Sequence, residues 1–408
     1  MRNKACSRIY SGLAKSLTMK TLLLYSLILT AHYSFAQPQT GAIQPGADQT
    51  NLYVSTLQGK RVGMVVNHTS VIKRAGGYTH LVDSLKSLGI TMKTIFAPEH
   101  GFRGQASAGE KINNGIDVKT GIRIISLYGE NRKPTPAQLD SLDVLIFDIQ
   151  DVGVRFYTYI STMHYVMEAC AEANKQLLIL DRPNPNGHLV DGPVLDPAFK
   201  SFVGMHPISV AHGLTVGELA RMINGEKWLP GGRKCPLTVI PNKNYTHATP
   251  YDLPFAPSPN LPNRQSILLY PSICFFEGTV VSVGRGTDKQ FQVIGSPNSK
   301  NGPYQFTPID TPGAVNPPQE NQLCYGLDLS KVDARKQGFT LKYLINFYEK
   351  SPEKDKFFLK GNFIDKLYGS DQLRKQVIAG VSERAIRKSW EPALGQYKEK
   401  RRGYLLYR

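Results

Sequence analysis

Short apolar runs alternate with amphipathic segments over the first two thirds of the chain. Residues 61–67, 91–97, 123–127, 144–149, 176–180 and 237–240 have the composition of buried strands. Between them, residues 78–88, 136–142, 158–174 and 215–224 place apolar side chains at helical spacing. All-apolar strands that alternate with helices predict a mostly parallel sheet covered on both faces. We therefore expect an α/β, Rossmann-like doubly wound core over residues 51–262.

The last third of the chain has a different pattern. Residues 250–262 (PYDLPFAPSPNLP) are dense in proline and indicate either a linker or a rigid loop that lines a cleft. Beyond them, residues 280–283 and 291–294 are strand-like, and residues 341–348 and 373–389 are helix-like. We predict a second, smaller α+β domain over residues 263–408.

The first residues resemble an export signal. Residues 1–36 contain five Lys and Arg, an apolar core at 21–30 and a small-x-small motif that ends at Ala36. This order of features predicts a signal peptide over residues 1–36, followed by a polar linker over 37–50. Position 37 is Gln and not Cys, which argues against a lipid anchor. We expect an exported protein, periplasmic or secreted, without a membrane anchor.

Charge and cysteine content refine this interpretation. The formal net charge of +17 becomes +12 without residues 1–36, because that segment holds five basic and no acidic residues. A basic exported protein suits an anionic partner such as cell-wall glycan, and nucleic acid is a poor partner in that location. The four cysteines that remain form no CxxC motif. One or two disulfides are compatible with export, whereas Cys170, inside an apolar helical pattern, fits a buried thiol.

Polar side chains follow four of the predicted strands at the point where each strand ends. In open parallel sheets, ligands bind outside the carboxyl ends of the strands. Any one of these residues is as readily a helix cap or an ion-pair partner, but four polar strand ends together predict a site. The candidates from the first, second and fourth strands are Asn67, Glu99, His100, Arg103, Asp148, Gln150, Asp151, Arg155 and Tyr157.

Glu99 is the principal candidate for a catalytic acid. Pro98 before it fixes the turn, and Gly101 after it lets a partner approach closely. A glutamate in a partly apolar cleft suits general acid catalysis, and His100 would orient it. The structural alternative for Glu99 is an ion pair with Arg103.

The remaining charged candidates fit a sugar site. Hydrolysis of a glycosidic bond usually uses two carboxyl groups, and Asp148 or Asp151 would supply the second. The alternative for Asp148 is a cap or a backbone contact at the sheet edge. Arg155 could hold a substrate carboxylate through two parallel hydrogen bonds, or it could pair with Asp151.

The second domain adds three candidates, all next to glycines or in a glycine-rich turn. Glu277 and Arg285 are predicted substrate contacts, together with Asp288, although Arg285 and Asp288 could form a turn ion pair instead. No metal or other cofactor is predicted, because His68 and His100 lack metal-ligand spacing and no GxGxxG follows the first strand.

Several segments together resemble a known family. They are 62–70 (VGMVVNHTS), 96–104 (FAPEHGFRG), 147–159 (FDIQDVGVRFYTY), 181–185 (DRPNP), 276–279 (FEGT) and 284–288 (GRGTD). The family was long catalogued as a domain of unknown function and is associated with exo-β-N-acetylmuramidases of the NamZ type. The resemblance extends over nearly all of the chain after the signal.

The resemblance implies a Rossmann-like domain, a smaller C-terminal domain and a site in the cleft between them. It implies an exo-acting glycoside hydrolase that releases N-acetylmuramic acid from the non-reducing end of peptidoglycan disaccharides or muropeptides, with Glu99 as the catalytic candidate. The lactyl carboxylate of that sugar would explain Arg103, Arg155 and Arg285. Two alternatives stay open: a hydrolase of esters, amides or lactyl ethers on the same glycan, and a non-catalytic protein that binds cell-wall glycan.

Overall fold

A seven-stranded sheet organises the first part of the chain in the computed structural model, which describes residues 41–102 and 114–407. Its strands are β1 (Val62–Val66), β4 (Met92–Ala97), β5 (Gly115–Ile116), β6 (Arg123–Ser126), β7 (Val144–Asp148), β8 (Gln176–Leu180) and β11 (Leu237–Ile240). They lie in the order β11-β8-β7-β1-β4-β6-β5, and every neighbouring pair is parallel except β5 and β6. The predicted α/β fold is confirmed.

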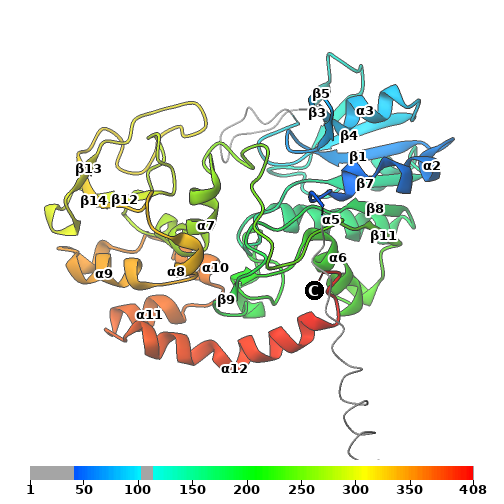
Figure 1. The fold of residues 1–408 in the computed structure, drawn as a ribbon. Helices are drawn as coiled ribbons and strands as arrows, with labels where there is room; N and C mark the ends of the chain where they lie inside the picture. Colours follow the sequence, from blue (N-terminus) through cyan, green and yellow to red (C-terminus); the bar gives the residue numbers. More distant parts are fainter. Residues whose placement is uncertain (1–40, 103–113, 408) are drawn as a thin grey trace, which may run out of the picture. The chain divides into compact units, whose positions relative to one another are not determined.

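Helices cover both faces of this sheet (Figure 1). They are α2 (Val54–Leu57), α3 (Leu81–Ser87), α4 (Pro136–Leu139), α5 (Tyr159–Glu172) and α6 (Val216–Gly225). Successive side chains of a strand point to opposite faces. Val65 and Phe147 accordingly belong to the core that includes α5 and α6, whereas Met64 and Ile146 belong to the core that includes α2 and α3. This is the doubly wound arrangement that the apolar strands predict.

The strand order reverses at β1. The chain forms β4 and β6 on one side of β1, and then β7, β8 and β11 on the other. Loops that leave such a reversal diverge and open a crevice at the carboxyl edge of the sheet. The loops after β1, β4 and β7, which carry Asn67, Glu99 and Asp151, therefore lie next to one another at that edge.

The second part of the chain contains a three-stranded antiparallel sheet and several helices, as the predicted α+β pattern requires. The elements are α7 (Arg264–Ile273), β12 (Val293–Ser296), β13 (Tyr304–Phe306), β14 (Cys324–Asp328), α8 (Ala334–Gln337), α9 (Lys342–Lys350), α10 (Phe363–Tyr368), α11 (Gln372–Ile378) and α12 (Glu383–Arg402). The predicted strand at 280–283 is wrong, because its pairing is limited to one isolated bridge between Ser282 and Gly295. Strands β13 and β14 are short and carry polar residues, so no apolar run marked them.

Two predicted helices are divided in the structure. Residues 78–88 contain β3 (Gly77–His80), which pairs with β2 (Val71–Arg74), and the helix α3 starts only at Leu81. Residues 373–389 contain nearly all of α11 and the start of α12, separated by Gly380 in the left-handed region (φ 70°). The hairpin of β2 and β3 takes up the first residues of the first predicted helix, and a glycine-containing turn interrupts the second.

Part of the predicted N-terminal linker belongs to the fold. Gln44 forms a bridge with Lys243, and the Gly46 amide donates to the Asp181 carbonyl at 2.8 Å. A Cβ on Gly46 would lie 2.3 Å from the Ile240 carbonyl oxygen, so only glycine fits there. Residues 44–46 therefore form an extra contact along β8 and β11 and are not a free linker.

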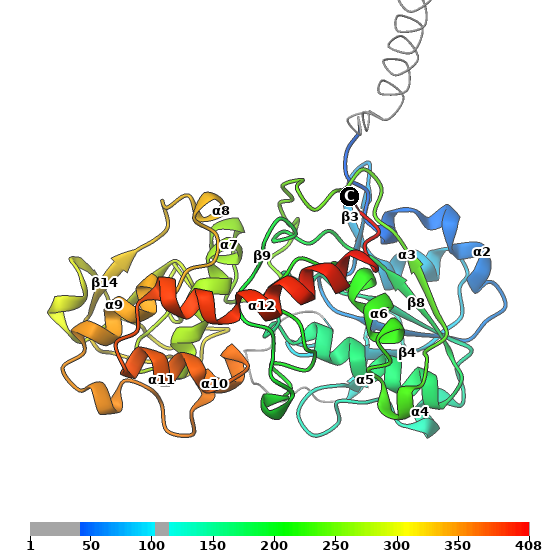
Figure 2. The same ribbon diagram turned by 90° about the horizontal axis from the view of Figure 1, so that it is seen from below.

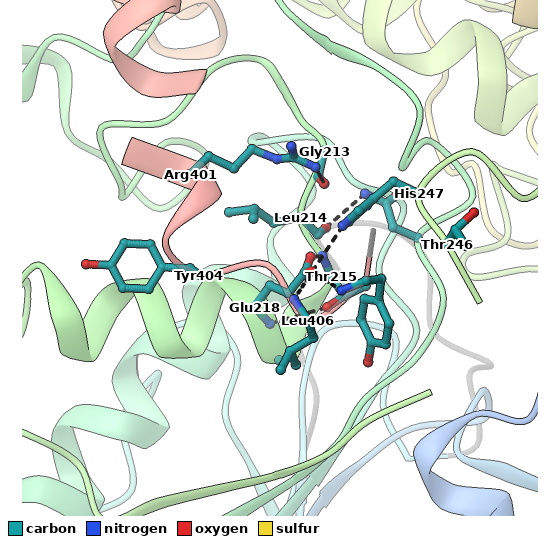
Figure 3. Close-up of polar contacts among 12 residues, drawn as sticks. Gly213, Leu214, Thr215, Glu218, Thr246, His247, Arg401, Tyr404 and Leu406 are labelled. Carbon is teal, nitrogen blue, oxygen red and sulfur yellow. Dashed lines mark hydrogen bonds and ion pairs between the residues drawn. The ribbon is translucent and has the colours of Figure 1, made fainter. Parts of the chain in front are cut away.

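The end of the chain returns to the first domain. Figure 2 shows α12 extending from α11 toward α6. Figure 3 shows the buried carboxylate of Glu218 with its partners: Oε1 accepts from His247 Nε2 at 3.0 Å and from the Leu406 amide at 2.7 Å. Tyr407 Oη donates to Asp181 at 2.6 Å. The predicted C-terminal domain therefore ends against the first one, within one compact unit over residues 43–408.

The four cysteines in the described part of the chain are free and buried. Cys170 lies on the core-facing side of α5, where its thiol contacts that of Cys235. The prediction of a buried thiol at Cys170 is confirmed.

Candidate active site

A cleft of about 630 Å³, including its open mouth, lies at the carboxyl edge of the sheet. Its lining residues are Glu99, His100, Phe156, Tyr157, Thr158, Tyr159, Val203, Ser258, Asn260, Leu261, Tyr270, Glu277, Arg285 and Phe291. The proline-dense segment contributes Ser258, Asn260 and Leu261, so it lines the cleft rather than linking two domains. Carboxylates, a guanidinium, hydroxyls and aromatic rings within one small cleft are a suitable lining for a charged sugar.

A strained turn places Glu99 at the cleft. Strand β4 ends at Ala97, and the Gly101 amide then donates to the Pro98 carbonyl at 3.0 Å. His100 and Gly101 both have positive φ, 67° and 75°. A histidine in the left-handed region costs free energy, and such strain is often found at functional sites. This turn directs the chain away from the sheet directly after Glu99.

Two hydroxyl groups fix the carboxylate of Glu99. Tyr128 Oη donates to Oε1 at 2.9 Å, and Thr158 Oγ1 donates to Oε2 at 2.9 Å. Neither partner was among the predicted site residues. Tyr128 follows the predicted strand at 123–127, so the strand-end rule that led to Glu99 could also have found it. The pair of hydroxyls holds Glu99 in one orientation at the cleft wall.

Arg285 and Glu277 form an ion pair in the same cleft. Arg285 Nε donates to Glu277 Oε1 at 2.6 Å, and the guanidinium carbon lies 5.1 Å from the ring centre of Phe291. Within the described residues, the two terminal nitrogens of Arg285 have no hydrogen-bond partner, yet they are not sealed from solvent. They are donors that a bound anion can use. Arg285 pairs with Glu277, so the alternative of a turn ion pair with Asp288 does not hold within the described residues. Asp288 is exposed and absent from the cleft lining, and its role as a substrate contact stays a prediction.

Tyr157 lies on the cleft wall, where the sequence predicts it. Its hydroxyl donates to the Pro257 carbonyl at 2.8 Å, and its ring packs edge-on against Tyr159. Tyr157 thereby attaches the proline-dense segment to the loop after β7. Its role as a sugar contact stays a prediction.

Comparison with known proteins identifies the family. A model described as exo-β-N-acetylmuramidase NamZ, N-terminal, matches residues 62–265, and the C-terminal NamZ model matches residues 268–407. The chain belongs to the NamZ family. Peptidoglycan β-N-acetylmuramidase NamZ of Bacillus subtilis is 40% identical over 380 residues, which cover 87% of this chain and 89% of that protein.

Solved structures agree with this assignment. A Bacteroides fragilis protein described as a DUF1343 family protein superimposes with a TM-score of 0.83 and 49% identity, covering 90% of this chain and 99% of that one. A second Bacteroides fragilis protein of the same description gives a TM-score of 0.77 and 28% identity at the same coverage. In this NamZ chain, Glu99 lies in the segment matched by the N-terminal model and Arg285 in that matched by the C-terminal one, so both segments build the cleft.

The structure places Asp148 outside the cleft lining, whereas the sequence predicts it in the site. It is fully buried and does not line the cleft. Arg182 holds it through two hydrogen bonds, Nε to Oδ1 at 2.5 Å and Nη2 to Oδ2 at 2.8 Å. The predicted role of second catalytic carboxylate does not fit this position, because both oxygens are occupied below the cleft floor.

Replacing Asp148 by Asn is expected to lower the free energy of unfolding by about 3–5 kcal/mol, since Arg182 would stay buried without its counter-charge. Urea unfolding of the two proteins measures the difference. The matched control is Asp143→Asn, which breaks the exposed pair with Arg61. Water screens exposed pairs, so that loss should be small. Equal losses in the two variants would contradict a structural role for Asp148.

The side chain of Asn67 shapes its own loop after β1, and that of Gln150 connects the loops after β7 and β8. Asn67 Oδ1 accepts from the Thr69 amide at 2.9 Å and from its hydroxyl at 2.6 Å. Gln150 Nε2 donates to the carbonyls of Asp151 and Pro183, at 2.7 and 2.8 Å. Both side chains are buried and absent from the cleft lining, so the structure does not place them as direct substrate contacts.

Asp151 is a buried carboxyl group with one unused oxygen. Its Oδ1 accepts from the Gly153 amide at 2.6 Å, whereas Oδ2 has no partner among the described residues. Burial raises the pKa of Asp151 to about 7. His212 Nε2 lies 3.8 Å from Oδ1, and burial lowers the pKa of His212 to about 3. Asp151 is absent from the cleft lining, and its role as a second carboxylate stays a prediction.

The raised pKa of Asp151 predicts a pH-dependent loss of stability. Between the ordinary pKa of 3.8 and about 7, the folded state holds a proton that the unfolded state has lost, so stability falls as pH rises. Asp151→Asn removes this loss, on the order of 4 kcal/mol at full ionisation. In urea unfolding across this range, the free energy of unfolding of Asp151→Asn relative to the wild type should increase as the pH rises. A constant difference would contradict a raised pKa in the folded protein.

Arg155 is buried and holds carbonyl groups from three parts of the chain. Nη1 donates to the carbonyls of Pro193 and Ile208, and Nη2 donates to those of Leu367 and Tyr368. The side chain is fully buried and absent from the cleft lining, so the structure does not place it as a direct substrate contact. Arg103 lies outside the described residues.

The histidines near the cleft form no metal centre in the described part of the chain. No group of three or more His, Cys, Asp or Glu side chains there could hold a metal ion. His68 Nε2 instead contacts the Ala256 carbonyl oxygen at 2.7 Å, at the edge of the proline-dense segment.

Proposed function

We propose that this chain is an exo-acting glycoside hydrolase that releases N-acetylmuramic acid from the non-reducing end of peptidoglycan fragments. The observation that carries the proposal is one cleft that presents both the fixed carboxyl group of Glu99 and the available guanidinium of Arg285. The first can protonate a leaving glycosidic oxygen, and the second can bind a carboxylate. Membership of the NamZ family and the activity named for the Bacillus subtilis relative support it.

The two carboxylates in the cleft have different surroundings, and we assign them different roles. The hydroxyls of Tyr128 and Thr158 hold Glu99 in one orientation at the cleft wall, whereas Glu277 pairs with Arg285. We assign proton transfer to the leaving group to Glu99. Glu277 holds Arg285 in position, and the rings of Tyr270 and Phe291 offer apolar surface to the sugar ring.

Arg285→Ala is expected to weaken inhibition by free N-acetylmuramic acid by about 10- to 100-fold, because hydrogen bonds to a charged group are lost. Inhibition by N-acetylglucosamine, which lacks the lactyl carboxylate, should not change. The measurement is the inhibition constant of each sugar against a chromogenic β-N-acetylmuramide. Arg264→Ala, at an exposed arginine of α7 outside the cleft, is the control. Equal weakening for both sugars would contradict carboxylate recognition by Arg285.

Hydrolysis of a chromogenic β-N-acetylmuramide tests the proposed activity. Release of the aglycone is the expected result. Release of acetate or lactate with the aglycone still attached would favour a hydrolase of esters, amides or lactyl ethers. Binding without any release would favour a non-catalytic protein that binds cell-wall glycan.

We also propose that the protein is exported to the periplasm or secreted. The support is the basic, apolar and small-residue order within residues 1–36. Within the described residues, no helix has both the length and the apolar character to cross a membrane. N-terminal sequencing of the protein from cell fractions should find Gln37 as the first residue, and an uncleaved chain in the cytoplasm would contradict export.

A further inference from the structure

The positive charge of the chain is concentrated in its last part. Residues 331–408 contain 19 Lys and Arg against 9 Asp and Glu, a net charge of +10. Residues 37–330 contain 25 against 23, a net charge of only +2. The cleft uses none of this excess, because its lining ends at Phe291. The helices from α8 to α12 therefore form a strongly basic part of the molecule that the proposed reaction does not require.

Helix α12 orders part of this charge along one face. At 3.6 residues per turn, positions four, fourteen and eighteen residues after the first lie on the same side of a helix. The exposed basic residues with this spacing, here called the basic stripe, are Arg384, Lys388, Lys398 and Arg402. The buried residues on the other side are Ile386, Trp390, Leu394 and Tyr397. The stripe spans roughly 27 Å along the helix axis, at 1.5 Å per residue.

The other basic residues of α12 have a different task. Arg387 pairs with Asp191 at 2.6 Å, and Lys400 pairs with Glu226 at 2.7 Å. These pairs attach α12 to the first domain. In the described part of the chain, only Arg402 among the stripe residues forms an ion pair, with the exposed Glu399. Arg401 Nη2 also donates to the Gly213 carbonyl. The helix thus uses three basic residues for anchoring. The stripe keeps an excess of positive charge, because only Glu391 and Glu399 are acidic on that side of the helix.

We propose that the basic stripe docks a linear polyanion, a polymer with repeated carboxylate or phosphate groups. A row of exposed cations that outnumber the acidic side chains beside them attracts such a polymer through Coulomb attraction and the release of its counterions. A lipid surface fits less well, because a helix that inserts into a membrane interface needs an exposed apolar face. The apolar face of α12 is buried in the protein, and no large apolar side chain is exposed between residues 383 and 402.

The benefit of this surface rests on the proposed function. A hydrolase that removes sugars one at a time from glycan ends gains if it stays close to the wall between reactions. Docking on α12 leaves the cleft free, since no stripe residue lines it. The stripe should therefore influence retention on an anionic polymer and leave hydrolysis of a small soluble substrate unchanged.

The test compares two triple variants with the same change of charge. The stripe variant is Arg384→Glu, Lys388→Glu and Lys398→Glu. The control variant is Lys60→Glu, Lys93→Glu and Lys234→Glu, at three exposed lysines of the first domain that form no ion pair with a described residue. Binding of each protein to soluble polyglutamate is measured at increasing NaCl concentration. The stripe variant should bind at least about tenfold more weakly than the wild type, with a shallower salt dependence, and the control should bind nearly as the wild type does.

Three results would overturn the proposal: no binding of polyglutamate by the wild type at low salt, equal losses in both variants, or binding to vesicles of anionic lipid but not to polyglutamate. The second would mean that net charge alone matters, and the third would favour a membrane surface. Activity on a chromogenic β-N-acetylmuramide should be equal in all three proteins. A wild type that binds polyglutamate without this activity would support the stripe and contradict the proposed function, so the two can fail separately.

Discussion

Glu99→Gln is expected to lower kcat/KM for a chromogenic β-N-acetylmuramide by about 10²- to 10⁴-fold, the range for loss of a general acid or base. The amide has the same shape as the carboxyl group but cannot transfer a proton. It can still contact the hydroxyls of Tyr128 and Thr158, which hold the native side chain. The thermal unfolding temperature should therefore change little, and the loss should appear in the rate.

Two variants serve as controls for this result. Glu130→Gln changes an exposed glutamate that does not line the cleft and should leave kcat/KM unchanged. Tyr128→Phe removes one of the hydroxyls on Glu99 and should reduce kcat/KM less than Glu99→Gln does, because the carboxyl group stays. A wild-type rate in Glu99→Gln would assign proton transfer to another group.

Arg155→Ala is expected to destabilise the protein by about 4 kcal/mol or more, because several buried carbonyl oxygens would lose their donor. The four acceptors come from three separate places in the sequence, the carbonyls of Pro193, Ile208 and the adjoining Leu367 and Tyr368. No carboxylate of the described residues pairs with the guanidinium, and burial lowers the pKa of Arg155 to about 9. Denaturant unfolding measures the loss.

Arg155→Lys tests whether the positive charge of Arg155 or the geometry of its guanidinium stabilises the protein. A lysine keeps the cation but has a single nitrogen, so it can reach only some of the carbonyls, and an intermediate loss is expected. The inhibition constant for N-acetylmuramic acid should be unchanged in whatever fraction of Arg155→Ala is folded. Unchanged stability together with a raised inhibition constant would indicate that Arg155 contacts the substrate.

The segment 144–159 shows what the sequence can and cannot predict. Its apolar half predicts a buried strand, and β7 confirms it. Its polar half looks like a single site wall, but the structure places only Tyr157 and its neighbours on the cleft. The partners of Asp148 and Arg155 explain the difference, since they lie 34 and up to 213 residues away in the chain. Such distant partners leave no local signal in the sequence.

Glu99 could be predicted because its position depends on local features. An apolar strand, a proline and a glycine determine where the turn lies, and the parallel topology brings the turn to the ligand-binding edge. The ion pair of Arg285 with Glu277 joins two loops that are eight residues apart, and nothing in the sequence favoured it over the pair with Asp288. The course of α12 was also beyond prediction, because its contacts with the first domain depend on tertiary packing.

Two disaccharides of opposite order test the exo-acting muramidase activity most directly. One has N-acetylmuramic acid β-linked at its non-reducing end to N-acetylglucosamine, and the other has the two sugars exchanged. Mass spectrometry of the products should show equal amounts of both free sugars from the first disaccharide and no cleavage of the second. Cleavage of both, or release of lactate or acetate with the glycosidic bond intact, would contradict an exo-acting muramidase.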